Sequence, residues 1–349
     1  MKKPGGFDRA DEGEDAPSSR LEEISKPQTP NPKAEESRED KVPKVGPSEF
    51  KNWSLPALLL LTFGCLLLFL RKPFFIDDTL FLRVAEQIQR HPTDFFGSSM
   101  NWGHTTTPMS EVFDNPPLAC YYLAAAASVV GWSEPALHLA FVLPALAAIW
   151  GIFVLAKRHC HNPALAAALA LVSPVFLISA STVMCDVLML ALWVWAVVLF
   201  DRGVRTTEME VRNPPRSFLI PLESRYRGKV GKSGVGFLFS GILAGLAYLT
   251  KFPALALVPL FLAYGFFKRR RVGWWLIAPL VPLVVAGGYE WLTYRLYGHG
   301  HLLQAATYSH EQNASLGLGD RLVLGAGFAG ACFLPVLFYA PLLWRRQVL

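Results

Sequence analysis

Long apolar runs separated by polar segments dominate the chain after residue 52. The first run, about Trp53 to Leu70, carries no charge and is just long enough to cross about 30 Å of hydrocarbon at about 1.5 Å per residue. Charged residues make up 17% of the chain and apolar residues 52%, whereas soluble domains are about 25% charged. The sequence therefore predicts an all-α polytopic membrane protein.

About eight membrane spans are expected from these runs. Residues 235–264 are too long for one span and are broken by Lys251 and Pro253, so this run is divided into two helices. The other expected spans cover residues 53–70, 135–156, 162–179, 183–200, 274–297 and 322–344.

The charge is distributed unevenly along the chain. Residues 1–50 hold nine Lys/Arg and twelve Asp/Glu, a net charge of −3, which leaves +9 for the remainder of a chain whose total is +6. The basic residues flank apolar runs, as the positive-inside rule requires of cytoplasmic loops, and form no separate basic domain for nucleic acid. Residues 1–51 are polar and rich in Pro, Glu and Ser, so a disordered cytoplasmic tail without a signal peptide is expected.

With the tail inside, residues 52–349 form a transmembrane core whose loops alternate between the two sides. The cytoplasmic loops are 157–159, 201–234, 268–271 and 345–346, and they hold most of the basic charge. The outer loops are 71–135, 180–182, 250–252 and 298–320.

The first outer loop contains its own amphipathic segments. Residues 78–91 are apolar at Leu80, Phe81, Val84, Ala85 and Ile88, a spacing that predicts a helix lying on the membrane interface. Residues 92–114, rich in Gly, Thr, Ser and Asn, are expected to be irregular. Pro116 and Pro117 then begin an apolar run to Val130, which predicts a second interfacial or re-entrant helix.

Polar groups collect at the outer ends of separate spans. The adjacent carboxylates Asp77 and Asp78 follow the first span, and charge at a membrane surface is costly unless it binds something or moves protons. An outer cavity lined by acids and bases suits a phosphate-linked donor and an acceptor hydroxyl that must lose its proton. The outward candidates include Asp77, Asp78, Asp114, Asp186, Lys251, Arg295, His299, His301 and His310.

Four motifs in this order resemble the protein mannosyltransferase and aminoarabinose transferase group of GT-C fold glycosyltransferases. They are Phe75-Ile76-Asp77-Asp78, residues 115–123 (NPPLACYYL), Met184-Cys185-Asp186 and residues 245–253 (GLAYLTKFP). The resemblance covers roughly residues 53–345. It implies a GT-C-type helical bundle with interfacial helices in the first extracytoplasmic loop, a polyprenyl-phosphate sugar donor, and inversion at the anomeric carbon.

The resemblance also implies roles for individual residues. Asp77 matches the acid that acts as general base on the acceptor hydroxyl, Asp78 fills the place of a second acid, and Asp186 matches an acid that lines the same cavity. Lys251 matches a basic residue that meets the donor phosphate, and Arg295 is a second candidate cation for the leaving phosphate.

A divalent metal ion is the one cofactor that the resemblance raises. Asp114 matches an acid before Pro-Pro that in some members holds a metal together with a later histidine, for which His299, His301 and His310 are equal candidates. Asn115 departs from the pattern, because aminoarabinose-type members often carry a base there, and this argues against aminoarabinose as the sugar.

Simpler roles compete with each of these assignments. Asp77 or Asp78 could cap the helix that follows, Lys251 could anchor a span at the interface, and the loop histidines could be plain solvated residues. For the whole chain, the alternatives are a polytopic transporter or lipid-linked sugar flippase and a non-catalytic assembly subunit. The expected partners are a polyprenyl-phosphate sugar, a hydroxyl acceptor and the bilayer, with no nucleic acid, and the expected location is the bacterial plasma (inner) membrane.

Overall fold

The structure is a computed structural model that describes residues 50–102, 105–212, 222–314 and 316–327. The chain divides into two units, Met1–Ser48 and Glu49–Leu349, and the described residues all belong to the second. The prediction of a disordered tail therefore falls outside the described residues, except for Phe50 and Lys51, which begin the first described helix.

The expected spans up to residue 297 are helical, which confirms the mainly helical membrane architecture. Apolar runs of this length satisfy their backbone groups internally when they form helices. The expected span at 322–344 lies mostly outside the described residues. The helices of the bundle are α2 (Phe50–Leu67), α6 (Glu134–His159), α7 (Pro163–Leu171), α8 (Pro174–Ala180), α9 (Asp186–Arg212), α10 (Leu222–Thr250), η1 (Phe252–Ala256), α11 (Leu257–Arg269), η2 (Trp274–Leu276) and α12 (Ile277–Tyr297).

The described residues contain fewer full-length spans than the eight expected. Four helices are long and apolar enough to cross a membrane, or five if one bent pair is counted as a single span. The bent pair is α7 and α8, which meet at 63° where one straight span over 162–179 was expected. Pro174 explains the bend, because it lacks a backbone N–H and holds the preceding Ser173 in an extended conformation.

The break between α10 and α11 confirms the division of the 235–264 run. Helix α10 ends at Thr250, and Lys251 is extended, with φ −158° and ψ 131°. Pro253 then lies in the first turn of η1, where a missing N–H costs little. The chain therefore turns at Lys251 and presents this residue at the end of a helix.

Residues 71–135 are only partly as expected. The helix expected over 78–91 is confirmed as α3 (Asp78–Arg90), which buries Phe81, Val84, Ala85 and Ile88 in the protein core, and the helix after Pro117 is α5 (Leu118–Val130). Between them, the prediction of irregular structure is wrong at an antiparallel hairpin, since β1 (Ser99–Trp102) pairs with β2 (Thr105–Pro108). The β-branched threonines at 105–107 favour a strand there.

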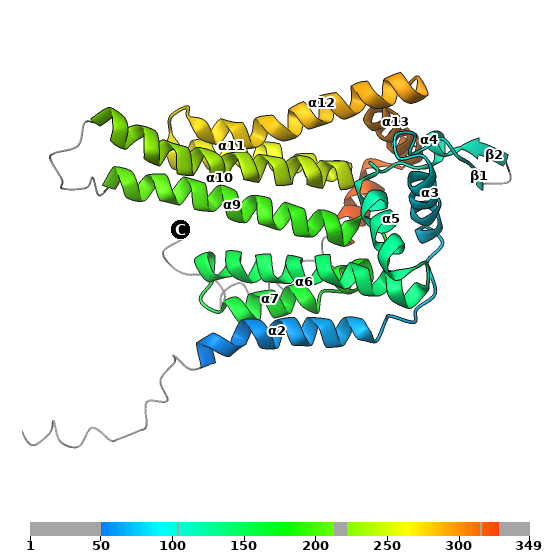
Figure 1. The fold of residues 1–349 in the computed structure, drawn as a ribbon, viewed down its shortest axis with the longest axis horizontal. Coiled ribbons are helices and arrows are strands. Elements are labelled where there is room, and N and C mark those ends of the chain that lie inside the picture. Colours follow the sequence, from blue (N-terminus) through cyan, green and yellow to red (C-terminus); the bar gives the residue numbers. More distant parts are fainter. Residues whose placement is uncertain (1–49, 103–104, 213–221, 315, 328–349) are drawn as a thin grey trace, which may run out of the picture. The chain divides into compact units, whose positions relative to one another are not determined.

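Residues 298–320 also differ from the polar loop that was expected. They contain α13 (His301–Ala314), which packs against the end of α12. A four-residue helix, α4 (Met109–Val112), follows the hairpin. In Figure 1 the long helices run side by side, while α3, α4, α5, α13 and the hairpin gather at one end of this unit.

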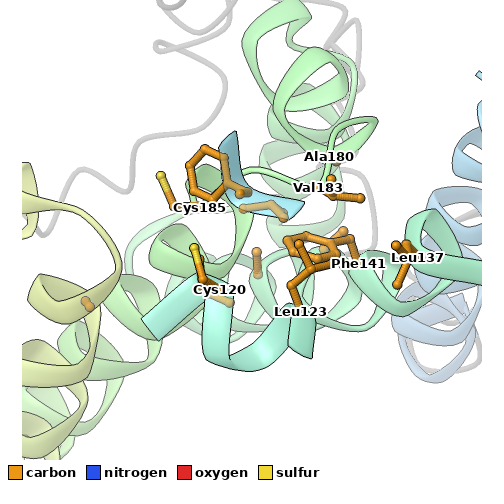
Figure 2. Close-up of a cluster of buried hydrophobic side chains, with 14 of the residues drawn as sticks. Cys120, Leu123, Leu137, Phe141, Ala180, Val183 and Cys185 are labelled. Carbon is orange, nitrogen blue, oxygen red and sulfur yellow. The ribbon is translucent and has the colours of Figure 1, made fainter. Parts of the chain in front are cut away.

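Apolar side chains fix the first-loop helices to the bundle. Figure 2 shows Cys120 and Leu123 of α5 in one cluster with Leu137 and Phe141 of α6 and with Val183. Each of these five side chains is fully buried. Helices α3 and α5 therefore form part of the same core as the spans, and their polar residues have fixed positions relative to the span ends.

Candidate active site

A lysine and a carboxylate from separate helix ends form an ion pair. Asp186 is the first residue of α9, and Lys251 lies at the break after α10. Lys251 Nζ donates to Asp186 Oδ1 at 2.6 Å, and both side chains are about one-third exposed, 30% for Lys251 and 29% for Asp186. The structure thus joins two of the predicted site residues and leaves the pair accessible.

The segment before Asp186 also contacts the first loop. Cys185 is fully buried, and its thiol lies 3.7 Å from the Asn115 Oδ1 atom. Asn115 begins the motif that leads into α5, so the motifs at 115–123, 184–186 and 245–253 meet at one place.

Asp77 and Asp78 have different environments. Asp78 is fully buried, and its carboxylate accepts two backbone hydrogen bonds, from Phe75 N to Oδ2 at 2.7 Å and from Val183 N to Oδ1 at 3.1 Å. Burial raises its pKa above the usual value, against the opposing effect of those two N–H groups. Asp78 therefore fastens the first loop to the segment that precedes Asp186.

Asp77 keeps a free carboxylate. It precedes α3 and is half-buried, its side chain makes no capping hydrogen bond, and no partner for it is found among the described residues. Because Asp78 binds Val183, only three residues before Asp186, the Asp77 backbone lies close to the segment that carries the ion pair. Lys72 strengthens this connection, since its Nζ lies 3.3 Å from both the carbonyl oxygen and the Oγ atom of Ser181.

The predicted metal residues are brought together only in part. His301 is 2% exposed; its Nε2 lies 2.5 Å from the Phe113 carbonyl oxygen and its Nδ1 2.6 Å from the Tyr289 hydroxyl. A carbonyl only accepts, so Nε2 carries the proton and Nδ1 accepts from the tyrosine in the neutral ring. Burial lowers the pKa of His301 to about 4, so the ring is neutral at pH 7.

His299 occupies a comparable position. Its Nε2 lies 3.3 Å from the Ser110 carbonyl oxygen and its Nδ1 3.1 Å from that of Tyr297. Thus His299 and His301 fasten the start of α13 to residues 110–113, immediately before Asp114. Asp114 itself is half-buried, its pKa is raised by burial, and no hydrogen bond to it is found in the described part of the chain.

These contacts use the ring nitrogens that a metal would need. In the described ranges no group of three or more His, Cys, Asp or Glu side chains is arranged to hold a metal ion. His310 is exposed on α13. The residues present therefore do not form a metal site in this conformation.

Arg295 is not joined to the ion pair by any contact between described residues. It lies exposed in the last turn of α12. Glu290, earlier on the same helix, accepts a hydrogen bond from Leu302 N at 2.8 Å, which connects α12 to α13. A phosphate role for Arg295 thus has less geometric support than the same role for Lys251.

Sequence reasoning missed Tyr248. This side chain is fully buried, and its hydroxyl has no hydrogen-bond partner within the described residues. Its ring lies 6.1 Å from that of Tyr289 and 5.6 Å from that of Phe252. The available signal was its position inside the motif at residues 245–253, three residues before Lys251.

One family of known proteins matches part of the chain. Residues 114–211 match the family described as dolichyl-phosphate-mannose-protein mannosyltransferase. That segment includes Asp114, Asn115, Cys185 and Asp186. No curated protein matches the chain.

Two solved structures are similar to parts of the chain. ArnT from Cupriavidus metallidurans bound to undecaprenyl phosphate is 18% identical, with 72% of this chain and 43% of that chain covered and a TM-score of 0.48. The archaeal oligosaccharyltransferase AglB from Archaeoglobus fulgidus, with an inhibitory peptide and a dolichol-phosphate, is 16% identical, with 84% and 37% covered and a TM-score of 0.49. The chain spans less than half the length of either.

Proposed function

We propose that this protein is a membrane glycosyltransferase that moves a sugar from a polyprenyl-phosphate donor to an acceptor hydroxyl. The observation that carries the proposal is the hydrogen bond from Val183 N to Asp78, because it fastens the loop bearing the free Asp77 carboxylate beside the Asp186–Lys251 pair. The family match over residues 114–211 supports the same chemistry.

Asp77 is the proposed general base. The acceptor oxygen gives its proton to Asp77 and bonds to the anomeric carbon, while the bond from that carbon to the phosphate oxygen breaks. Attack from the face opposite the phosphate inverts the anomeric carbon. A positioned base contributes about 10²–10⁴ in rate, and Asp77 suits the task because its carboxylate makes no competing hydrogen bond.

Lys251 is the proposed partner of the departing phosphate. Asp186 holds Lys251 Nζ at the break between α10 and η1, so the ammonium group is positioned before the donor arrives. A fixed cation stabilises charge that develops on a leaving group. Arg295 remains a second candidate for this role, as a cation exposed near the end of α12.

The reaction is proposed for the extracytoplasmic face of a bacterial plasma (inner) membrane, with the N-terminus in the cytoplasm. The support is that most basic residues after residue 52 lie in the loops expected to be cytoplasmic, and that the described parts of these loops, 157–159, 201–212 and 268–271, lie at the end of the bundle away from Asp77 (Figure 1). The lipid-linked donor then meets the site in the outer leaflet.

The proposal is tested with purified protein and a panel of radiolabelled polyprenyl-phosphate sugars. The wild-type protein should consume one donor, and Asp77→Asn should lower transfer by at least about 10²-fold without changing the unfolding temperature. Glu86→Gln is the matched control, because Glu86 is a carboxylate on α3, the helix that Asp77 precedes, and it pairs with the exposed Arg83 at 3.5 Å.

Two results would contradict the proposal. Normal transfer by Asp77→Asn would contradict the assignment of Asp77 as general base, and consumption of no donor by wild-type protein would contradict the proposed activity.

The bent α7–α8 pair favours a second candidate, a lipid-linked sugar flippase, because broken helices are typical of transporters. Movement of a fluorescent lipid-linked sugar between the leaflets of proteoliposomes, with no sugar transfer, would favour that candidate.

A further inference from the structure

A hollow lies at the end of α11, away from the candidate active site. It has a volume of about 380 Å³ and is lined by Ala263, Phe266, Phe267 and Arg270. Phe266 is 50% exposed and Phe267 is 83% exposed. This volume is within the range of about 300–1,000 Å³ for small-molecule sites, and the lining is apolar with one guanidinium group.

The turn that follows the hollow is rigidly built. Trp275 is 2% exposed, its indole N–H donates to the Arg271 carbonyl oxygen at 2.9 Å, and its ring packs edge-on against Phe266 with centroids 5.0 Å apart. Gly265 makes room for that indole, because a Cβ atom there would lie 2.4 Å from the Trp275 ring. The backbone of this turn is therefore held in place by Trp275.

Arg270 adopts a backbone conformation that L residues avoid. It ends α11 with φ 49° and ψ 9°, and it is the one residue other than glycine with positive φ in the described ranges. Glycine or asparagine usually occupies this position at a helix end. Strain of this kind tends to persist where a side chain has a task, and the Arg270 side chain lines the hollow.

The positive charge around the hollow is not neutralised within the described part of the chain. Lys268, Arg270 and Arg271 are exposed and form no ion pair there. The nearest buried acid, Asp201, is already bound by Arg158, by Arg205 and by the Tyr264 hydroxyl. An anion from outside the chain would therefore meet uncompensated cations next to exposed aromatic rings.

We infer that this hollow binds an anionic glycerophospholipid of the membrane. The headgroup phosphate contacts Arg270, with Lys268 and Arg271 nearby, and an acyl chain lies along Phe266 and Phe267. Basic pockets beside spanning helices are suited to lipids of this class. The site is separate from the proposed transfer chemistry, so it holds whether or not the protein moves a sugar.

The test measures lipid retained by the purified full-length protein by native mass spectrometry, after equilibration with vesicles of equal parts phosphatidylglycerol and phosphatidylcholine. Wild-type protein should retain phosphatidylglycerol preferentially, and more weakly at high salt. Arg270→Gln should lower that preference by about five-fold, as expected for one cation near an anionic surface. Arg202→Gln is the control, because it removes an exposed arginine from the same end of the bundle without altering the hollow.

A second variant separates the effect of the Arg270 side chain from the effect of its backbone conformation. Arg270→Gly suits the positive φ, so it should fold at least as well as wild type and still lose the preference for phosphatidylglycerol. Equal retention of both lipids by wild-type protein, an unchanged preference in Arg270→Gly, or an equal loss in Arg202→Gln would overturn the inference.

Discussion

At the scale of single residues, neighbouring side chains of the same chemistry have different tasks. Asp78 is buried and accepts two backbone hydrogen bonds, whereas the adjacent Asp77 is half-buried and has no partner among the described residues. A carboxylate used as a base must be accessible and free to accept a proton. This difference, which comes from the turn at residues 75–78, is the basis for proposing Asp77 as the base, while Asp78 holds the turn to Val183.

His301 should make stability depend on pH. Its folded pKa of about 4 lies below the usual histidine pKa of about 6.5, so the unfolded chain takes up a proton first as the pH falls. The stabilisation by neutral His301 is complete above about pH 6.5 and is lost progressively towards pH 4. The loss at pH 4 is about 3 kcal/mol at most, at about 1.4 kcal/mol per pKa unit.

Thermal unfolding of wild-type protein and His301→Gln between pH 7 and pH 4 measures this contribution. The variant should be less stable at pH 7 but lose less stability on acidification. His310→Gln is the matched control, because His310 is exposed on the same helix. Parallel pH curves for wild type and His301→Gln would show that His301 is not the titrating group.

At the scale of elements, α10 and α12 approach each other through glycines. A Cβ atom at Gly241 would lie 2.9 Å from Val281 Cβ, and one at Gly245 would lie 2.9 Å from Val285 Cγ2. Two small residues four apart let helix backbones pack closely in a membrane. This contact fixes the end of α10, and hence Lys251, relative to α12.

Gly245→Val should therefore destabilise the protein by about 1–3 kcal/mol, the usual cost of overpacking. Gly287→Val on α12 is the control, because a Cβ atom there would meet nothing within 4 Å. Unfolding in detergent at increasing denaturant reports both variants. If they lose equal stability, the cost comes from the substitution of a helical glycine and not from the contact between α10 and α12.

Ionic contacts hold the other end of the bundle. Asp201 of α9 is 2% exposed and is bound by Arg158 of α6, by Arg205 one turn along its own helix, and by Tyr264 of α11. A buried carboxylate is stable when its oxygens are paired and hydrogen-bonded in this way. Asp201 therefore connects three helices at the end remote from the candidate active site.

At the scale of the whole molecule, the proposed orientation places the hairpin outside and the turn after α11 in the cytoplasm. In a background without native cysteines, Thr105→Cys should react with a membrane-impermeant maleimide in intact cells, since Thr105 is exposed on β2. Val272→Cys, 77% exposed, should react only after permeabilisation. The reverse pattern would place Asp77 on the cytoplasmic side and remove the proposed donor geometry.

The sequence by itself determined most of the helical segments up to residue 297, the amphipathic helix α3 and the break at Lys251. Each follows from local rules: apolar length sets a span, a spacing of three to four residues sets a helix face, and proline interrupts a helix. The motifs at 115–123, 184–186 and 245–253 also contain residues that contact one another in the folded chain.

Only the tertiary structure decided which of the polar residues are free. The Val183 N–H donates to the Asp78 carboxylate, and Lys251 donates to Asp186. The His301 ring nitrogen that a metal would need is hydrogen-bonded to the Phe113 carbonyl oxygen. These partners lie from 65 to 188 residues apart in the chain. No local pattern specifies such pairings, because they arise when apolar faces pack and bring segments that are distant in the sequence into contact.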